Sequence, residues 1–285
     1  MTVLIGLLCS NGAVLGADRA VTHTDSSKMP VAEGELQKIT VFEGGRAAVA
    51  ISGNVGGGQL VVDSLRKFSD ETAGGASKSR TEAVALDTIR EALQQRSNDY
   101  LRAFKELGFQ GLPASEWIKD ASKKVIGSGI YIRGVGSGGK CRPCVVTFDG
   151  GYEVEHLQDG VPFSAAGTGS HFAIPYMLML RELLFLKVLP DVDQGMKAVY
   201  WALDATIRAR AGFGVGQGID LAVLQATMDG SFRVRLLVQG ELEALAVIQS
   251  EINKKIGIAF QEAVKDSKIP AAPTEDEALK GIAAK

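Results

Sequence analysis

Two apolar runs separated by Ser10-Asn11-Gly12 open the chain, within residues 2–22. Asn-Gly between apolar runs is typical of a tight turn that joins two antiparallel strands. A second pair of runs, residues 37–43 and 46–53, flanks a Gly44-Gly45 turn. The pattern therefore predicts two successive hairpins at the N-terminus, and with them an antiparallel sheet.

Further along, the spacing of apolar positions alternates between helical and extended periods. Helical spacing is found in 56–72, 79–108, 170–188, 192–212 and 241–266. Strand patterns are found in 125–135, 142–150, 152–158, 162–168, 218–230 and 232–238. Strands and helices that follow one another in blocks predict an α+β protein, with antiparallel sheets covered by helix layers. The helix at 170–188 is apolar on most sides, so we expect it to lie between two layers.

The order of these blocks predicts one domain followed by a short tail. No Ser/Pro-rich linker divides the chain and no fixed-period repeat is visible, so we expect a single domain over 1–268. Residues 269–285 are rich in proline, alanine and charge, which predicts a flexible C-terminal tail.

Composition narrows the class of partner. Lys plus Arg is 31 and Asp plus Glu is 33, a balance that argues against nucleic acid or an anionic membrane as the main partner. No stretch approaches the roughly 20 apolar residues that span a bilayer, and the start does not resemble a signal peptide. Three cysteines without a secreted spacing favour a reducing compartment, so we expect a cytoplasmic protein.

Thr2 is the first residue that carries possible chemistry. A Met-Thr start is ordinary, and Thr2 alone indicates nothing. If Met1 is removed, however, the Thr2 hydroxyl becomes a nucleophile whose own α-amine, with a pKa of about 7.7–8.0, serves as the base. Such a site also needs an acid, a buried cation that favours the ionised hydroxyl, and backbone N–H groups that meet an oxyanion.

Candidates for these supports follow in order. Asp18 ends the second strand of the hairpin that Thr2 begins, so the turn brings the two together. Lys38 alternates with apolar neighbours, although a lysine there is also compatible with a surface charge at a strand end. Gly53 marks a strand-to-helix junction, where free N–H groups bind developing negative charge.

Taken together, the segments resemble a known family. "TVLIGLLCSNGAVLGADRAVT", "KITVFEGGRAAVAISGNVGGGQ", "AAGTGS" and "GFGVGQGIDLAVL" are similar in order and spacing to a proteasome β-type subunit of the N-terminal nucleophile hydrolases. The likeness covers residues 2–70 and 126–237 and is nearest in character to bacterial proteasome-like proteins of the ancestral β-subunit group. It implies a four-layer αββα fold, with two antiparallel sheets between helix layers.

The resemblance also implies a catalytic set and a ring. Thr2 would be the nucleophile, Asp18 and Lys38 would activate it, Gly53 would stabilise the oxyanion, and Thr168 in "GTGS" would bond the α-amine. No metal or organic cofactor is required. Partners would be a peptide or unfolded-protein substrate, further copies in a homo-oligomeric ring and an ATPase or adaptor.

By the same resemblance, a second group of residues binds substrate. Thr22 would pair with the substrate backbone, whereas Val21, Ile51 and Val55 would line the pocket for the side chain before the cleaved bond.

Several positions depart from the family pattern. Ala20 stands where an arginine is usual, with Arg19 adjacent. A longer loop over 23–37 places Lys38 later in the sequence than the matching lysine of the family. The late Asp-x-x-Ser-Gly that supports the amine aligns with residues 212–216, which supply glycine and valine in place of Asp and Ser. The helical segment 76–125 is enlarged and, like the long C-terminal helix, is a candidate oligomer or partner surface.

Other patterns give no competing site. Gly134-x-Gly136-x-x-Gly139 matches a dinucleotide fingerprint but lies between two predicted strands, with no helix after it. Cys141-x-x-Cys144 lacks a second metal-binding pair, and the three histidines lack ligand spacing, so we expect no metal site.

Three functions remain open at this point. The first is a self-compartmentalising threonine peptidase that acts through an acyl-enzyme on Thr2. The second is an amidohydrolase of the same fold and nucleophile that cleaves a small amide metabolite. The third is a catalytically silent, proteasome-like ring scaffold.

Overall fold

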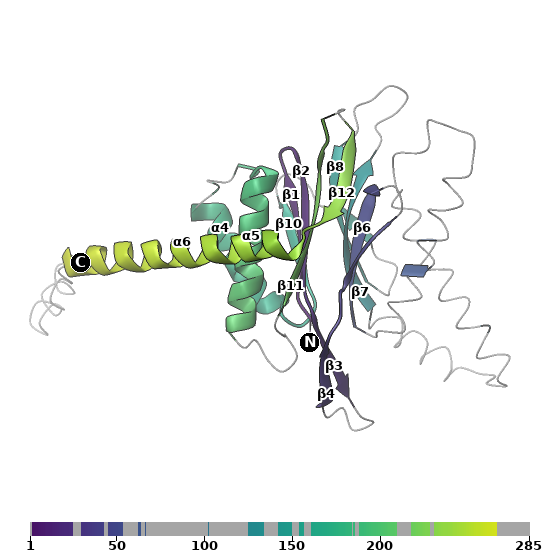
Figure 1. Cartoon of the computed structure of the whole chain (residues 1–285), viewed down its shortest axis with the longest axis horizontal. Coiled ribbons are helices and arrows are strands. Elements are labelled where there is room, and N and C mark those ends of the chain that lie inside the picture. The colour runs from purple at the N-terminus through teal and green to yellow at the C-terminus, as the bar shows by residue number, and fades with distance from the viewer. Residues whose placement is uncertain are drawn as a thin grey trace, which may run out of the picture. The chain divides into compact units, whose positions relative to one another are not determined.

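The structure is a computed structural model of the whole chain (Figure 1). It describes residues 2–24, 30–42, 45–53, 62–63, 66, 102, 125–133, 142–149, 154–156, 161–183, 185, 188–209, 218–228 and 231–266. By its internal contacts the chain divides into two compact units, Met1–Leu245 and Ala246–Lys285. The single domain over 1–268 and the flexible tail stay predictions. Within the described ranges, no helix combines the length and apolarity needed to cross a bilayer.

The first sheet has the strand order β10-β1-β2-β11-β12 and is antiparallel throughout. Its strands are β1 (Leu4–Cys9), β2 (Gly12–Asp18), β10 (Phe163–Ala166), β11 (Ile219–Ala226) and β12 (Phe232–Leu236). The predicted N-terminal hairpin is confirmed, with Cys9 paired to Gly12 and Leu4 to Ala17. All residues of β1 and β2 are buried, because both strands lie in the interior of a sheet that is covered on both faces.

The second sheet has the order β5-β6-β7-β8-β9 and is also antiparallel. Its strands are β5 (Ile39–Val41), β6 (Ala47–Gly53), β7 (Val125–Arg133), β8 (Arg142–Asp149) and β9 (Val154–His156). The helices are α4 (Ser170–Leu183), α5 (Val192–Arg208) and α6 (Gln239–Asp266).

Two cores hold these layers together. Leu4, Leu15 and Ile130 belong to the core between the two sheets, whereas Val3, Ile5 and Leu203 belong to the core between the first sheet and the helices. Figure 1 shows α4 and α5 on the face of the first sheet that points away from the second. The α+β fold class, with two stacked antiparallel sheets and helices, is therefore confirmed. The helices predicted over 56–72 and 79–108 lie almost entirely outside the described residues.

One predicted loop is in fact a hairpin. The segment 23–37, expected to be a longer loop, forms most of a small two-stranded sheet of β3 (Ala20–Thr24) and β4 (Pro30–Glu35). The prediction was wrong because β4 is polar and contains Pro30 and Gly34, so it lacks the apolar alternation that marks a strand.

The prediction for α4 was also wrong in part. One face of the helix is buried through Ala173, Met177 and Leu180, as expected. The opposite face is not enclosed, since Phe172 and Leu178 are each 43% exposed in the single chain. An apolar helix face is buried only if a layer covers it.

Candidate active site

Thr2 enters the first sheet just ahead of β1, and main-chain hydrogen bonds fix its position. The Val3 amide donates to Asp18 Oδ1 at 2.8 Å, and the Asp18 amide donates to the Val3 carbonyl at 3.2 Å. The Gly169 amide donates to the Thr2 carbonyl at 3.0 Å. Thr2 is 8% exposed. The residue is therefore held between the end of β2 and the segment that leads into α4.

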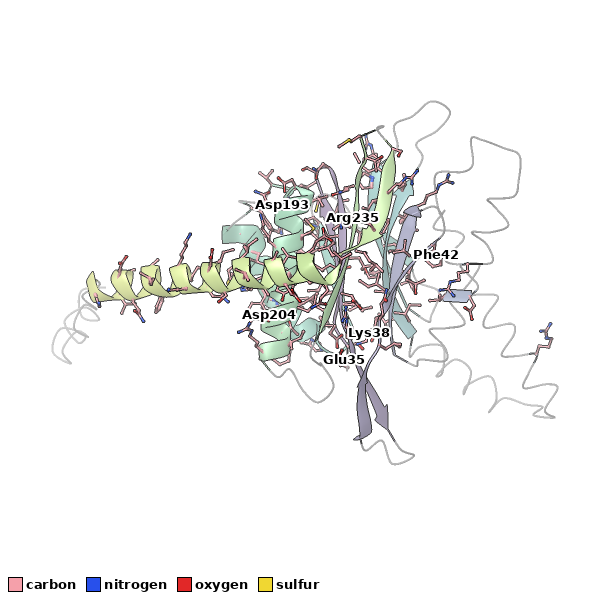
Figure 2. All side chains as sticks on the ribbon, in the orientation of Figure 1. Glu35, Lys38, Phe42, Asp193, Asp204 and Arg235 are labelled. Atoms are coloured by element: carbon pink, nitrogen blue, oxygen red, sulfur yellow. The ribbon has the colours of Figure 1, made fainter. Side chains whose placement is uncertain are left out.

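Lys38 joins the predicted nucleophile to the predicted acid. It lies one residue before β5 and reaches from the second sheet toward the first; Figure 2 shows it between the two sheets. Its Nζ donates to Thr2 Oγ1 and to Asp18 Oδ1, each at 2.9 Å. The side chain of Lys38 is 5% exposed and that of Asp18 is fully buried. The interpretation of Lys38 as a surface charge at a strand end is thus wrong.

Burial determines the ionisation of Lys38. Loss of hydration lowers its pKa below 10.5, because the charged ammonium is disfavoured away from water. The Asp18 carboxylate opposes this shift through charge and through its hydrogen bond, and Asp220 opposes it through charge. A lysine of this kind donates a hydrogen bond to a hydroxyl and releases its proton more readily than an exposed one.

Asp18 is fixed independently of the lysine. Its Oδ1 accepts from the Val3 amide and its Oδ2 from the Ala20 amide at 3.2 Å. These backbone donors hold the carboxylate at the end of β2, so it orients Lys38 without moving itself.

The segment 167–169 contacts Thr2 from the other side. Thr168 Oγ1 accepts a hydrogen bond from the Thr2 nitrogen at 3.2 Å. Gly167 has φ +84°, and a Cβ at this residue would lie 2.2 Å from the Thr2 carbonyl oxygen. Only glycine fits there. We had not predicted a role for Gly167, although the closely spaced glycines of "GTGS" are the signal that could have indicated it.

A second ion pair lies in the first sheet beside this group. Arg19 Nε and Nη2 both donate to Asp220 Oδ1, at 2.8 and 2.7 Å. The hydrogen bond to Asp220 raises the pKa of Arg19. Sequence reasoning had noted Arg19 but not Asp220, which is 201 residues away and has no local motif around it.

Gly53 ends β6 with φ +106°, at the strand terminus where an oxyanion donor was predicted. Its neighbour Ser52 lies near Gly167, since Ser52 Oγ is 3.3 Å from the point that a Cβ on Gly167 would occupy. The end of β6 is therefore close to the segment that contacts Thr2. The oxyanion role of Gly53 stays a prediction.

The structure gives less about the predicted substrate-binding residues. Ile51 lies in β6, half-buried and paired with Gly127. Val21 and Thr22 lie in β3, and their backbones pair with residues 34 and 33. Val55 and the segment 212–216 lie outside the described residues, so their predicted roles are untested.

No metal centre emerges from the described side chains. No three His, Cys, Asp or Glu residues among them are grouped as metal ligands would be. Cys9 and Cys144 are buried, and burial raises the pKa of the Cys9 thiol to about 12.

The chain is similar to solved structures in fold, at low sequence identity. The Anbu complex of Pseudomonas aeruginosa, described as a helical assembly, matches with a TM-score of 0.64 and 15% identity, covering 95% of this chain and 98% of that one. Anbu, the ancestral beta-subunit, from Yersinia bercovieri matches with a TM-score of 0.62 and 12% identity, covering 95% and 99%. A Gly-1 mutant of Anbu from Hyphomicrobium sp. strain MC1 gives 0.61 and 14%, covering 95% and 100%. No protein-family model and no curated protein matches the sequence.

These matches agree with the sequence resemblance at the level of the fold. The chain has the proteasome-like fold of the N-terminal nucleophile hydrolases, with two antiparallel sheets and flanking helices.

Proposed function

We propose that the protein is an N-terminal-threonine amide hydrolase, and that it cleaves peptides through an acyl-enzyme on Thr2 after Met1 is removed. One observation carries the proposal: the buried Lys38 ammonium donates to both the Thr2 hydroxyl and the Asp18 carboxylate at 2.9 Å. A buried cation on a hydroxyl stabilises the alkoxide form, which is the attacking species.

The acylation step begins with attack of Thr2 Oγ1 on the substrate carbonyl carbon. The hydroxyl proton passes to the Thr2 α-amine, directly or through water, while Lys38 stabilises the developing charge on Oγ1. Asp18 holds the lysine in place. Thr168 Oγ1, which accepts from the Thr2 nitrogen, would orient the amine so that its lone pair faces the hydroxyl.

The tetrahedral intermediate then collapses to an ester. The Gly53 amide would donate to the oxyanion, and the protonated α-amine would give its proton to the leaving amine. Water attacks the ester by the same route and releases the acid, which restores Thr2. Val21, Thr22, Ile51 and Val55 would bind the substrate segment before the cleaved bond.

We further propose that the protein works as a homo-oligomeric ring or related assembly in the cytoplasm. The exposed apolar residues Phe172 and Leu178 on α4 favour burial against another copy. A structure of similar fold is described as a helical assembly. A closed chamber would admit short or unfolded peptides, delivered by an ATPase or adaptor.

Three measurements on the full chain test the chemistry. Intact mass should show loss of Met1, and a peptide β-lactone should add one acyl group to Thr2. Thr2→Ala should abolish labelling and turnover of fluorogenic peptides, whereas Thr2→Ser should keep both because the hydroxyl remains. Processed protein that is never labelled, with turnover equal in Thr2→Ala, would exclude the threonine mechanism.

The same data separate the alternatives. Labelling without turnover of any peptide favours an amidohydrolase that acts on a small amide metabolite. A retained Met1, which blocks the amine, favours the silent scaffold.

A further inference from the structure

Asp220 lies on the same face of the first sheet as the nucleophile. It pairs with Ala17 across β11 and β2, and Ala17 pairs with Leu4 across β2 and β1. Ala17 and Leu4 both belong to the core between the two sheets. Thr2 shares that face because residues two apart on a strand point the same way. Asp220 thus faces the same layer between the two sheets in which Lys38 meets Thr2.

The carboxylate of Asp220 is only half satisfied. Arg19 donates twice, but both bonds go to Oδ1. Oδ2 is buried and accepts no hydrogen bond from the part of the chain that the structure describes. A buried carboxylate oxygen without a donor costs free energy, so an ordinary structural ion pair would use both oxygens of the carboxylate and the guanidinium fork. This geometry therefore indicates a role beyond the pairing with Arg19.

Besides Arg19, the charged group on which Asp220 acts is Lys38. Asp220 favours the charged form of Lys38 and raises its pKa against the effect of burial. Among the described residues, the acids whose charge acts on Lys38 are Asp18 from β2 and Asp220 from β11. Arg19 binds Asp220 and lies near Glu35 of β4.

We propose that Asp220 is a positioning residue of the threonine site: its carboxylate, held by Arg19, faces the layer between the sheets and attracts the buried Lys38 ammonium, which keeps that ammonium on Thr2 Oγ1. The proposal rests on the proposed function. The family pattern has an Asp and a Ser where residues 212–216 of this chain have glycine and valine. Asp220 would supply a negative charge to the site that those residues cannot supply.

Charge balance explains why such a residue is useful. Asp18 alone would neutralise Lys38, and the guanidinium of Arg19 would leave a positive charge nearby. Asp220 balances the charge of Arg19 beside this pair. With Arg19 balanced in this way, no net positive charge opposes the Lys38 ammonium, so the ammonium stays on Thr2 Oγ1.

The test measures the titration of Lys38 without using activity. The full-length protein is labelled competitively with acetic anhydride between about pH 7 and 11, and acetylation of Lys38 is quantified by peptide mass spectrometry. Asp220→Asn should lower the apparent pKa of Lys38, because an attracting charge is lost. Arg19→Gln should raise it, because Asp220 is no longer neutralised. Asp204→Asn, which removes the acid of an exposed ion pair with Arg208 on α5, is the matched control and should leave it unchanged.

The opposite signs distinguish electrostatics from structure. The proposal is overturned if the pKa of Lys38 shifts in the same direction in both variants, or shifts in neither. A general disturbance of the structure would not be expected to lower this pKa in one variant and raise it in the other. If Asp220→Asn does not fold, the double variant Arg19→Gln/Asp220→Asn is compared with Arg19→Gln: a lower pKa of Lys38 in the double variant supports the proposal, and an equal or higher one refutes it.

Activity is recorded separately. The pH profile of Thr2 acylation should move with the pKa of Lys38 in each variant. If neither the wild type nor any variant is acylated, the proposed function fails. The acetylation data then still decide whether Asp220 controls the pKa of Lys38.

Discussion

Replacing Lys38 by methionine tests the central contact most directly. The change keeps the apolar stem but removes the ammonium, so the fully buried Asp18 carboxylate loses its cation. Removal of one partner of a buried pair costs about 3–5 kcal/mol. Asp18 keeps two backbone donors, from Val3 and Ala20, so we expect the lower end, about 3 kcal/mol of unfolding free energy at pH 7.5.

The loss should also depend on pH with a defined sign. Burial lowers the pKa of Lys38 below 10.5 in the folded protein, whereas the unfolded chain titrates near that ordinary value. Between these two pKa values the unfolded state binds more protons, so wild-type stability gains from this lysine as pH rises. Lys38→Met lacks the gain. The difference between the two proteins should therefore widen toward pH 10.5.

Urea unfolding followed by circular dichroism, at fixed protein concentration from pH 7.5 to 10.5, measures both effects. Lys197→Met is the matched control, because Lys197 pairs with Asp193 on the exposed face of α5 and should contribute under about 0.5 kcal/mol. A loss below about 1 kcal/mol for Lys38→Met, with a pH dependence parallel to wild type, would refute the buried bridge.

Three further outcomes are expected. Gly167→Ala should slow β-lactone acylation of Thr2 by about 100-fold, since the new Cβ displaces the Thr2 carbonyl; wild-type rates would contradict the contact. Phe172→Glu with Leu178→Glu should reduce the assembly mass in light scattering without lowering the melting temperature, and an unchanged mass would remove α4 from the interface. Cys9, with its pKa raised to about 12, should resist iodoacetamide at pH 8 in native protein and react in urea; rapid native alkylation would contradict its burial.

The sequence predicted what is encoded locally. The Asn-Gly turn places residues 2–9 against 12–18, so Thr2 and Asp18 are brought together by one hairpin register. Lys38 was harder, because a lysine among apolar neighbours fits both a buried and an exposed strand end. Only the packing of one sheet on the other determines that its ammonium is buried on Thr2.

Contacts between distant strands could not be predicted in this way. The pairing of Arg19 with Asp220 depends on β11 lying beside β2, and neither residue has neighbours that mark it. The β3–β4 hairpin was missed because β4, which contains Pro30 and Gly34, lacks the apolar alternation that marks a strand. The exposed face of α4 was missed because apolar composition indicates that a surface is covered, but not whether the same chain covers it.

The position of β1 between β10 and β2 has a consequence for the order of events during synthesis. In the folded chain Thr2 is 8% exposed and is bonded to residues 168 and 169, which leave the ribosome long after the first strand. The contacts of Thr2 with residues 168 and 169 form only once this later segment has been made and β10 has paired with β1. An enzyme that removes Met1 from the growing chain would act before that stage. The proposed nucleophile would therefore be unmasked on the nascent chain, at a stage when Lys38, Thr168 and Asp220 are not yet assembled around it. The threonine would acquire its reactivity from folding, and not from the cleavage itself.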